Sequence, residues 1–191
     1  MDLATRYMGF DLPHPLVPGA SPLADDLDQV RRLEDAGAAA IILRSLFEEQ
    51  IEREQLGAER HIESHGESFA EAASYFPMPD EFALGPDRYL EQIRRIREAV
   101  AVPVIASLNG VTPEGWLGYA RSMVQAGAQG IELNVYYIPT DPAETSEHVE
   151  WRVIEAARQV REAVAVPLAV KLSPFYSSPA HLAARLDGLG V

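Results

Sequence analysis

Polar side chains able to bind a ligand follow short apolar runs at several points along the chain. They are Arg44 and Ser45, Ser107 and Asn109, Asn134, and Lys171 and Ser173. Each run has the length of a β-strand, and in parallel α/β folds the functional residues lie at the carboxyl ends of the strands. A lysine at such an end is costly to bury unless an anion or a dipole pairs with it. We therefore expect function to reside in these residues.

Two recurring phrases indicate how the strands are arranged. Arg-Glu-Ala-Val-Ala-Val-Pro occurs at 97–103 and 161–167, each time between a helical pattern and a short apolar run. Ala-Gly-Ala occurs at 36–38 and 126–128, before two further apolar runs. Repeated helix-to-strand units predict an α/β fold with a parallel sheet, of the (β/α)8 TIM-barrel type.

The sequence predicts a single domain over residues 1–191. Residues 1–15 are expected to form an N-terminal cap or hairpin, and residues 45–85 a long loop excursion after the second strand. Ser146 is the expected cap of the helix before the last strand. The expected strands cover residues 16–17, 39–43, 102–108, 130–134 and 168–171, and helices begin near Asp25, Pro86, Pro113, Ser146 and Pro179.

The number of these units predicts an incomplete barrel. The chain has 191 residues, and its last four stand where a sixth strand would begin. A complete barrel of this type usually takes about 250 residues. We expect the first five of eight units, with the closing strands absent, either as an amino-terminal fragment or as a shortened gene product.

Composition limits the classes of ligand. The 29 acidic residues outnumber the 16 lysines and arginines, giving a formal net charge of −13. A surface of this sign disfavours nucleic acid and anionic membranes as partners. The absence of cysteine excludes disulfides and thiolate metal sites. The N-terminus lacks the apolar core of a signal peptide, so the sequence predicts a cytoplasmic protein with a small-molecule substrate.

Three of the strand-end phrases resemble those of a known family. Pro-Gly-Ala-Ser at 18–21, Ile-Glu-Leu-Asn at 131–134 and Val-Lys-Leu-Ser-Pro at 170–174 occur in this order in dihydroorotate dehydrogenases. The chain resembles the amino-terminal part of that family over essentially its whole length. The resemblance implies an FMN-containing (β/α)8 barrel that oxidises dihydroorotate to orotate in pyrimidine biosynthesis.

The resemblance also implies which residues bind FMN. Arg44 replaces a lysine of the family and keeps a cation beside a reduced, anionic flavin, although the two side chains differ in geometry. The implied cofactor-binding residues are Ala20, Ser21, Arg44, Ser45, Asn109, Asn134 and Lys171.

The sequence departs from the family where the catalytic base is expected. The family carries cysteine or serine in the loop after the Glu-Leu-Asn phrase, whereas Tyr137 or Ile138 stands there, depending on the alignment. A tyrosine with a pKa near 10 would need a large shift to act as a base. The substrate-binding asparagine of the family is replaced by Pro139 or Thr140. The catalytic residues are therefore unassigned.

Structural explanations exist for the same residues. Lys171 can pair with Glu132, which by the period of two points to the opposite side from its strand neighbours. Arg44 can pair with an acidic residue of the following segment, at positions 48, 49 or 52. His61 and His65 share a helix face if that segment is helical, but two ligands make a weak metal site.

Two further functions stay open at this point. The chain can be a non-catalytic partial barrel whose open edge self-associates or pairs with a partner that supplies the missing strands. It can also be a barrel enzyme of the aldolase kind, with Lys171 forming a Schiff base.

Overall fold

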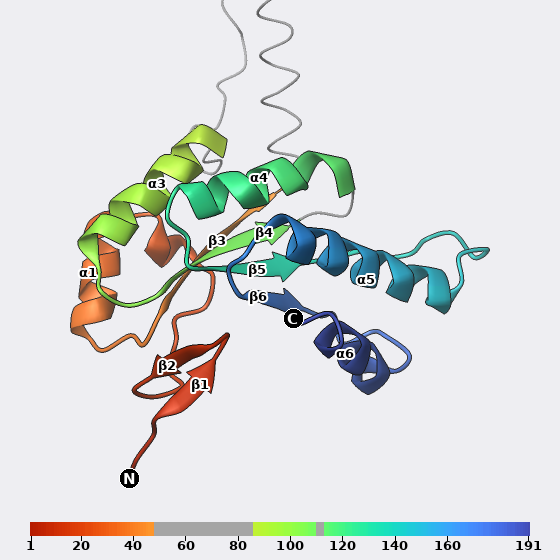
Figure 1. Cartoon of the computed structure of the whole chain (residues 1–191), viewed down its shortest axis with the longest axis horizontal. Helices are drawn as coiled ribbons and strands as arrows, with labels where there is room; N and C mark the ends of the chain where they lie inside the picture. Colours follow the sequence, from red (N-terminus) through yellow and green to blue (C-terminus); the bar gives the residue numbers. More distant parts are fainter. Residues whose placement is uncertain (48–85, 110–112) are drawn as a thin grey trace, which may run out of the picture.

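The computed structural model describes residues 1–47, 86–109 and 113–191. Most of the predicted 45–85 excursion, including the histidine pair, therefore lies outside the described residues. The elements alternate between helix and strand after an initial hairpin (Figure 1). They are β1 (Thr5–Tyr7), β2 (Phe10–Leu12), the 3-10 helix η1 (Pro22–Ala24), α1 (Leu27–Asp35), β3 (Ile41–Phe47), α3 (Pro86–Ala99), β4 (Val104–Asn109), α4 (Pro113–Gln125), β5 (Gly130–Asn134), α5 (Ser146–Ala163), β6 (Leu168–Lys171) and α6 (Pro179–Asp187).

The predicted parallel α/β architecture is confirmed. Strands β3, β4, β5 and β6 form a parallel sheet in chain order. Helices α1, α3, α4 and α5 lie along one side of this sheet, and the β1–β2 hairpin lies on the other (Figure 1). The main core joins the helices to the sheet and includes Ile93, Leu108, Leu133 and Val160, all fully buried. The sheet is open over the described residues, so closure into a barrel stays a prediction.

The hairpin covers the amino-terminal end of the second sheet face, which we call the hairpin face. Ile42 and Ile105 point to this face and pack against Met8 and Phe10 of the hairpin. The hairpin approaches β5 closely at Gly130, where an added Cβ would lie 3.0 Å from the Met8 Cε. The cap predicted at residues 1–15 is thus an antiparallel hairpin that seals one end of this face.

The recurring phrases prove to be helix endings. Gly37 and Gly127 both have positive φ, 92° and 110°, which glycine adopts at little cost. In each copy the glycine N–H and the following N–H donate to carbonyls of the last helical turn, as in a Schellman ending. In the longer phrase the arginine of each copy, Arg97 or Arg161, donates to carbonyls just beyond its own helix.

A β-bulge interrupts the pairing of β3 with β4. Ile42 pairs with Ile105 and Ser45 pairs with Ser107, so two residues of β3 oppose one residue of β4. Beside this bulge the buried hydroxyl of Tyr89, on α3, donates to the Ser107 carbonyl at 3.2 Å and accepts from the Ser107 N–H at 3.1 Å. The tyrosine therefore satisfies backbone groups that the bulge disturbs.

Three boundary predictions were wrong. Residues 16–17 form no regular strand and keep one sheet-like hydrogen bond, from the Ala39 N–H to the Leu16 carbonyl at 3.2 Å. Strand β3 continues to Phe47, so the excursion does not begin at residue 45. Helix α5 is capped by Thr145, whose hydroxyl accepts from the His148 N–H at 3.3 Å, and Ser146 is the first helical residue.

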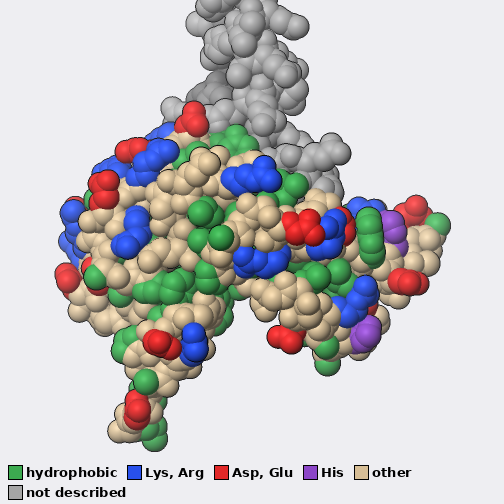
Figure 2. Space-filling model, in the orientation of Figure 1, with side chains coloured by type: hydrophobic (Ala, Val, Ile, Leu, Met, Phe, Trp, Pro, Cys, Tyr) green, Lys and Arg blue, Asp and Glu red, His purple; other side chains and the backbone are tan. Residues whose placement is uncertain are grey.

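The charged surface is mixed in sign. Acidic and basic side chains are interspersed over the part of the surface around α1 and α3 that Figure 2 shows. Among the described residues, no helix combines the length and the apolar character that a membrane span requires.

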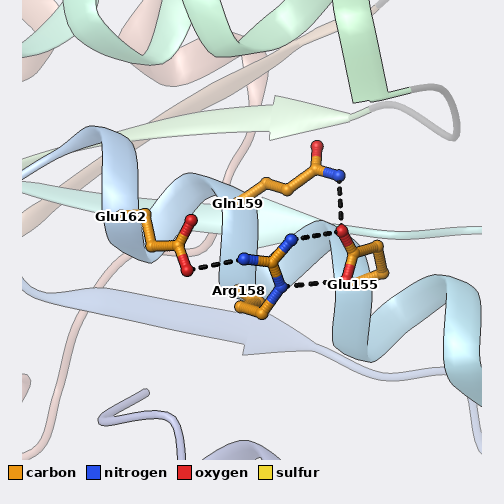
Figure 3. A network of polar contacts seen from close by, with 4 residues as sticks. All are labelled: Glu155, Arg158, Gln159 and Glu162. Atoms are coloured by element: carbon orange, nitrogen blue, oxygen red, sulfur yellow. Dashed lines mark hydrogen bonds and ion pairs between the residues drawn. The ribbon is translucent and has the colours of Figure 1, made fainter.

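A compact charge network stabilises the outer side of α5 (Figure 3). The Arg158 guanidinium donates to both oxygens of Glu155 at 2.5 and 2.9 Å, and to Glu162 at 2.6 Å. Gln159 donates to Glu155 at 2.7 Å. The hydrogen bonds from Arg158 are the largest cause, and the one from Gln159 the second, that lower the pKa of Glu155 to about 2.

We expect Arg158→Gln to return the pKa of Glu155 toward its ordinary value of 4.5. Because the carboxylate is favoured in the folded state, its contribution to stability is present above that value and disappears as the pH falls toward about 2. Carboxylate 13C shifts at about pH 3.5 should show an ionised Glu155 in the parent and a largely protonated one in the variant. Arg94→Gln, on α3, should leave Glu155 unchanged; equal titration in all three proteins would contradict the network.

Candidate functional site

Three of the predicted site residues form a row at the carboxyl ends of the strands. Asn109 on β4 is the register partner of Asn134 on β5, and Asn134 is the partner of Lys171 on β6. Since side chains alternate along a strand, these residues share the hairpin face with Ser107 and Glu132. The structure therefore brings Asn109, Asn134 and Lys171 together, as the strand-end pattern predicts.

A chain of polar contacts crosses the sheet two residues before this row, counted along β4 and β5. The hydroxyls of Ser45 on β3 and Ser107 on β4 are 2.7 Å apart. The Ser107 hydroxyl donates to Glu132 Oε1 at 3.2 Å. The Lys171 Nζ lies 3.2 Å from the same carboxylate oxygen. Because Ser107 gives its proton to Glu132, Ser45 must donate to Ser107.

This chain of contacts compensates a buried charge. Ser107 is fully buried and Glu132 is 7% exposed, whereas the Lys171 side chain is 51% exposed. A buried carboxylate is tolerated when a cation and hydrogen-bond donors satisfy it. The predicted pairing of Lys171 with Glu132 is confirmed, and the pair places a positive charge at the solvent side of the row.

The two asparagines supply unused hydrogen-bonding groups. Asn109 and Asn134 are half-buried. Within the described part of the chain, neither side-chain amide makes a hydrogen bond. Each amide offers two N–H donors and one carbonyl acceptor. The row can therefore bind a planar polar ligand by donors and acceptors, next to one ammonium group.

Arg44 lies in the bulge and pairs with a carboxylate that precedes it in the chain. Its guanidinium is 3.1 Å from Asp25, in the segment between η1 and α1. The positions first considered as partners lie outside the described residues. Burial raises the pKa of Asp25, and the charge of Arg44 opposes that effect. The structure thus shows Arg44 stabilising the η1–α1 segment.

Ala20 and Ser21 lie in the irregular segment between β2 and η1. Ala20 packs against the small cluster of Ile42 and Ile105 on the hairpin face. Ser21 precedes η1 in an extended conformation, and its side chain makes no capping hydrogen bond. Both residues are half-buried, and of the two Ala20 contacts the hairpin face.

Tyr137, at the position of the family's base, is engaged as a proton donor. Its hydroxyl donates to Glu144 Oε2 at 2.6 Å, and the Arg152 guanidinium lies 4.6 Å from the ring centroid. The hydrogen bond to Glu144 is the largest cause that raises the pKa of Tyr137 above its usual value. A higher pKa leaves less phenolate, the form that could accept a proton, at neutral pH. The alternative, Ile138, is an exposed apolar residue.

The described residues place no metal cluster at the row. The described residues contain no group of three or more histidine, aspartate or glutamate side chains placed to hold a metal ion. A hollow of about 450 Å³ lies beside the segment after β5 and is lined by Tyr137, Glu144 and Arg152, among others. The strand-end site is therefore defined here by its polar side chains.

Comparison with characterised proteins points to one family. No protein-family model matches the chain. A catalytic subunit of dihydroorotate dehydrogenase B (NAD(+)) from Methanopyrus kandleri is 29% identical over 171 residues, which cover 84% of this chain and 49% of the relative. The subunit of the same name from Thermoplasma acidophilum is 27% identical over 184 residues, covering 95% and 58%. The chain is similar to dihydroorotate dehydrogenases.

That similarity confirms the resemblance inferred from the strand-end phrases. The chain spans about half the length of the curated relatives it matches. The name of both relatives is that of an oxidoreductase.

Solved structures with a similar fold are TIM-barrel enzymes. A dihydrodipicolinate synthase from Agrobacterium tumefaciens has a TM-score of 0.50 and 16% identity, covering 90% of this chain and 48% of that one. A phosphonopyruvate hydrolase has a TM-score of 0.51 and 16% identity, covering 91% and 53%. The protein PhdJ, bound to a substrate intermediate, has a TM-score of 0.55 and 17% identity, covering 91% and 45%. These likenesses concern the fold alone.

Proposed function

We propose that the chain supplies flavin-binding residues of a dihydroorotate dehydrogenase-like oxidoreductase with a (β/α)8 barrel and FMN as its cofactor. This proposal rests on the row formed by Asn109, Asn134 and Lys171. Glu132 holds Lys171 in this row through an ion pair. In parallel barrels the ligand site lies at the carboxyl ends of the strands. The similarity to dihydroorotate dehydrogenase B subunits supports the same conclusion.

The residues of the row fit a flavin. The isoalloxazine ring carries carbonyl oxygens and a ring N–H along one edge, which match the amides of Asn109 and Asn134 in hydrogen-bonding type. The half-exposed ammonium of Lys171 suits the negative charge of a reduced flavin. A bound FMN would supply the acceptance of hydride from the substrate.

The protein groups have separate roles in this proposal. Glu132 fixes the Lys171 ammonium at the end of β6, and the Ser45–Ser107 pair fixes Glu132. Asn109 and Asn134 orient the ring through their amides. The group that takes a proton from the substrate is not assigned, because Tyr137 already donates its own proton to Glu144.

Flavin uptake tests this function. The purified chain, incubated with excess FMN and desalted, should retain an absorbance band near about 450 nm. Asn134→Ala and Lys171→Met should each weaken FMN binding at least about tenfold, because each removes a direct contact. Fluorescence titration of FMN gives the dissociation constants, and oxidation of dihydroorotate is the next assay.

Arg158→Gln is the matched control for the loss of a positive charge. Arg158 lies in the network on the outer side of α5, so its replacement should leave flavin binding unchanged. A folded chain that takes up no FMN would refute the proposal. Uptake that is equally strong in all of these proteins would refute the assignment of the row.

A further inference from the structure

A second pocket lies between the segment after β5 and the segment after β6. Its volume is about 210 Å³, and its walls are mainly apolar. Tyr137 and Val149 line one side and Phe175 and Tyr176 line the other. The polar groups come from Glu150 and from the three serines 146, 173 and 177. We call it the Glu150 pocket. Ser173, which follows β6, also lines it, but Asn109, Asn134 and Lys171 do not.

Glu150 is a buried carboxylate without a counterion among the described residues. The residue is 9% exposed, and the Ser177 hydroxyl donates to its Oε1 over 3.4 Å, a long hydrogen bond. In the described ranges no lysine, arginine or histidine forms an ion pair with it. The other two enclosed glutamates differ: Glu132 is paired with Lys171 and Glu144 with Arg152. An uncompensated buried charge is costly to the fold.

The apolar walls are suited to a cation that carries an organic group. Burial, and next the charge of Glu150, raise the pKa of Tyr176, so that its ring stays neutral beside the carboxylate. Aromatic rings attract cations over their faces. The Arg152 guanidinium already lies over the ring of Tyr137, which leaves Tyr176 and Phe175 as the rings open to a ligand.

We propose that the Glu150 pocket binds a small organic cation, an ammonium or guanidinium group attached to an apolar body. The charged group donates to Glu150 and Ser177, and the apolar body lies against Tyr176 and Phe175. A charge-assisted hydrogen bond to a shielded carboxylate is stronger than one between neutral groups. The proposal does not depend on flavin binding, because the pocket is formed by different residues.

Benzylamine, which is cationic at neutral pH, and the neutral benzyl alcohol are the probes. Titrated into the 15N-labelled full chain, benzylamine should shift the amide signals of residues 146–150 and 173–177. It should bind roughly tenfold or more tightly than benzyl alcohol, as expected for one charge-assisted hydrogen bond. Glu150→Gln should remove this preference, so that the two probes bind alike.

Glu147→Gln is the matched control, because it removes the same charge from an exposed position one turn earlier on α5. It should leave the benzylamine affinity within about twofold of the parent. Glu150→Gln should unfold at a temperature no lower than the parent, since it removes a charge without a counterion. Phe175→Ala, at a position 84% exposed, should weaken benzylamine binding without affecting folding.

Three results would overturn the proposal. One is the absence of shifts at up to about 10 mM benzylamine. Another is equal binding of the two probes to the parent. The third is a Glu150→Gln variant that still prefers the amine.

Discussion

Tyr89→Phe is expected to lower the free energy of unfolding by about 2–4 kcal/mol, although it removes a single oxygen atom. The lost hydroxyl serves both the N–H and the carbonyl of Ser107, at 3.1 and 3.2 Å. Both groups are fully enclosed, since Tyr89 is 3% exposed and Ser107 is not exposed at all. Each unsatisfied buried group costs about 1–3 kcal/mol.

The bulge explains why the effect should be so large. In a regular ladder the neighbouring strands satisfy each backbone group, but the extra residue of β3 disturbs the ladder at Ser107. Urea denaturation measures the change in stability. Hydrogen exchange of the Ser107 amide should also become faster in the variant, because its acceptor is gone.

Tyr136→Phe is the matched control for loss of a phenol hydroxyl. Tyr136 is 50% exposed, so the same change there should alter stability by less than about 0.5 kcal/mol. A loss below about 1 kcal/mol in Tyr89→Phe would mean that other groups satisfy Ser107 equally well.

Local sequence patterns predict most of the sheet. Strands β5 and β6 occupy the residues expected of them, 130–134 and 168–171. Their apolar runs are bounded by a glycine or a proline before and a polar residue after, which are strong local signals. The Ala-Gly-Ala phrases mark helix ends for an equally local reason, because only glycine adopts the positive φ readily.

Long-range contacts account for what the sequence does not predict. The bulge in β3 depends on the register with β4, and no residue type within β3 predicts it. The hydrogen bonds of Tyr89 to the Ser107 backbone follow from that register, so the sequence does not predict them either. Residues 16–17 are apolar like the other strands, but a run of two residues is too short to form a ladder by its own propensity.

In the candidate site, too, some contacts can be predicted from local patterns and others depend on long-range packing. Alternation along β5 and β6 predicts that Glu132 can pair with Lys171, and the structure contains this pair. The pairing of Arg44 with Asp25 is not predictable, since it depends on how the η1–α1 segment folds over β3. Glu150 follows the ordinary pattern of a helix, and only packing against the segment after β6 reveals it as a buried charge.

The second large effect concerns the Lys171–Glu132 pair. Replacing Lys171 should destabilise the protein more than replacing Glu132. Lys171→Met should lower the free energy of unfolding by about 2 kcal/mol, because it leaves the buried Glu132 with Ser107 as its hydrogen-bond donor. Breaking a fully buried pair costs about 3–5 kcal/mol, and the exposure of Lys171 reduces this value. Glu132→Gln should cost less than about 1 kcal/mol, since water can solvate the freed ammonium and glutamine still accepts from Ser107.

A double-mutant cycle separates the charge interaction from packing. If the penalty in Lys171→Met is the stranded carboxylate, adding Glu132→Gln should restore most of the loss, and the double variant should resemble Glu132→Gln alone within about 0.5 kcal/mol. Arg31→Gln, which breaks the exposed pair with Asp28, should change stability by less than about 0.5 kcal/mol. Strictly additive losses would show that Lys171 stabilises the sheet through its alkyl chain and that Glu132 does not hold it. In that case Glu132 would no longer explain how a cation is kept at the end of β6, whatever ligand the row binds.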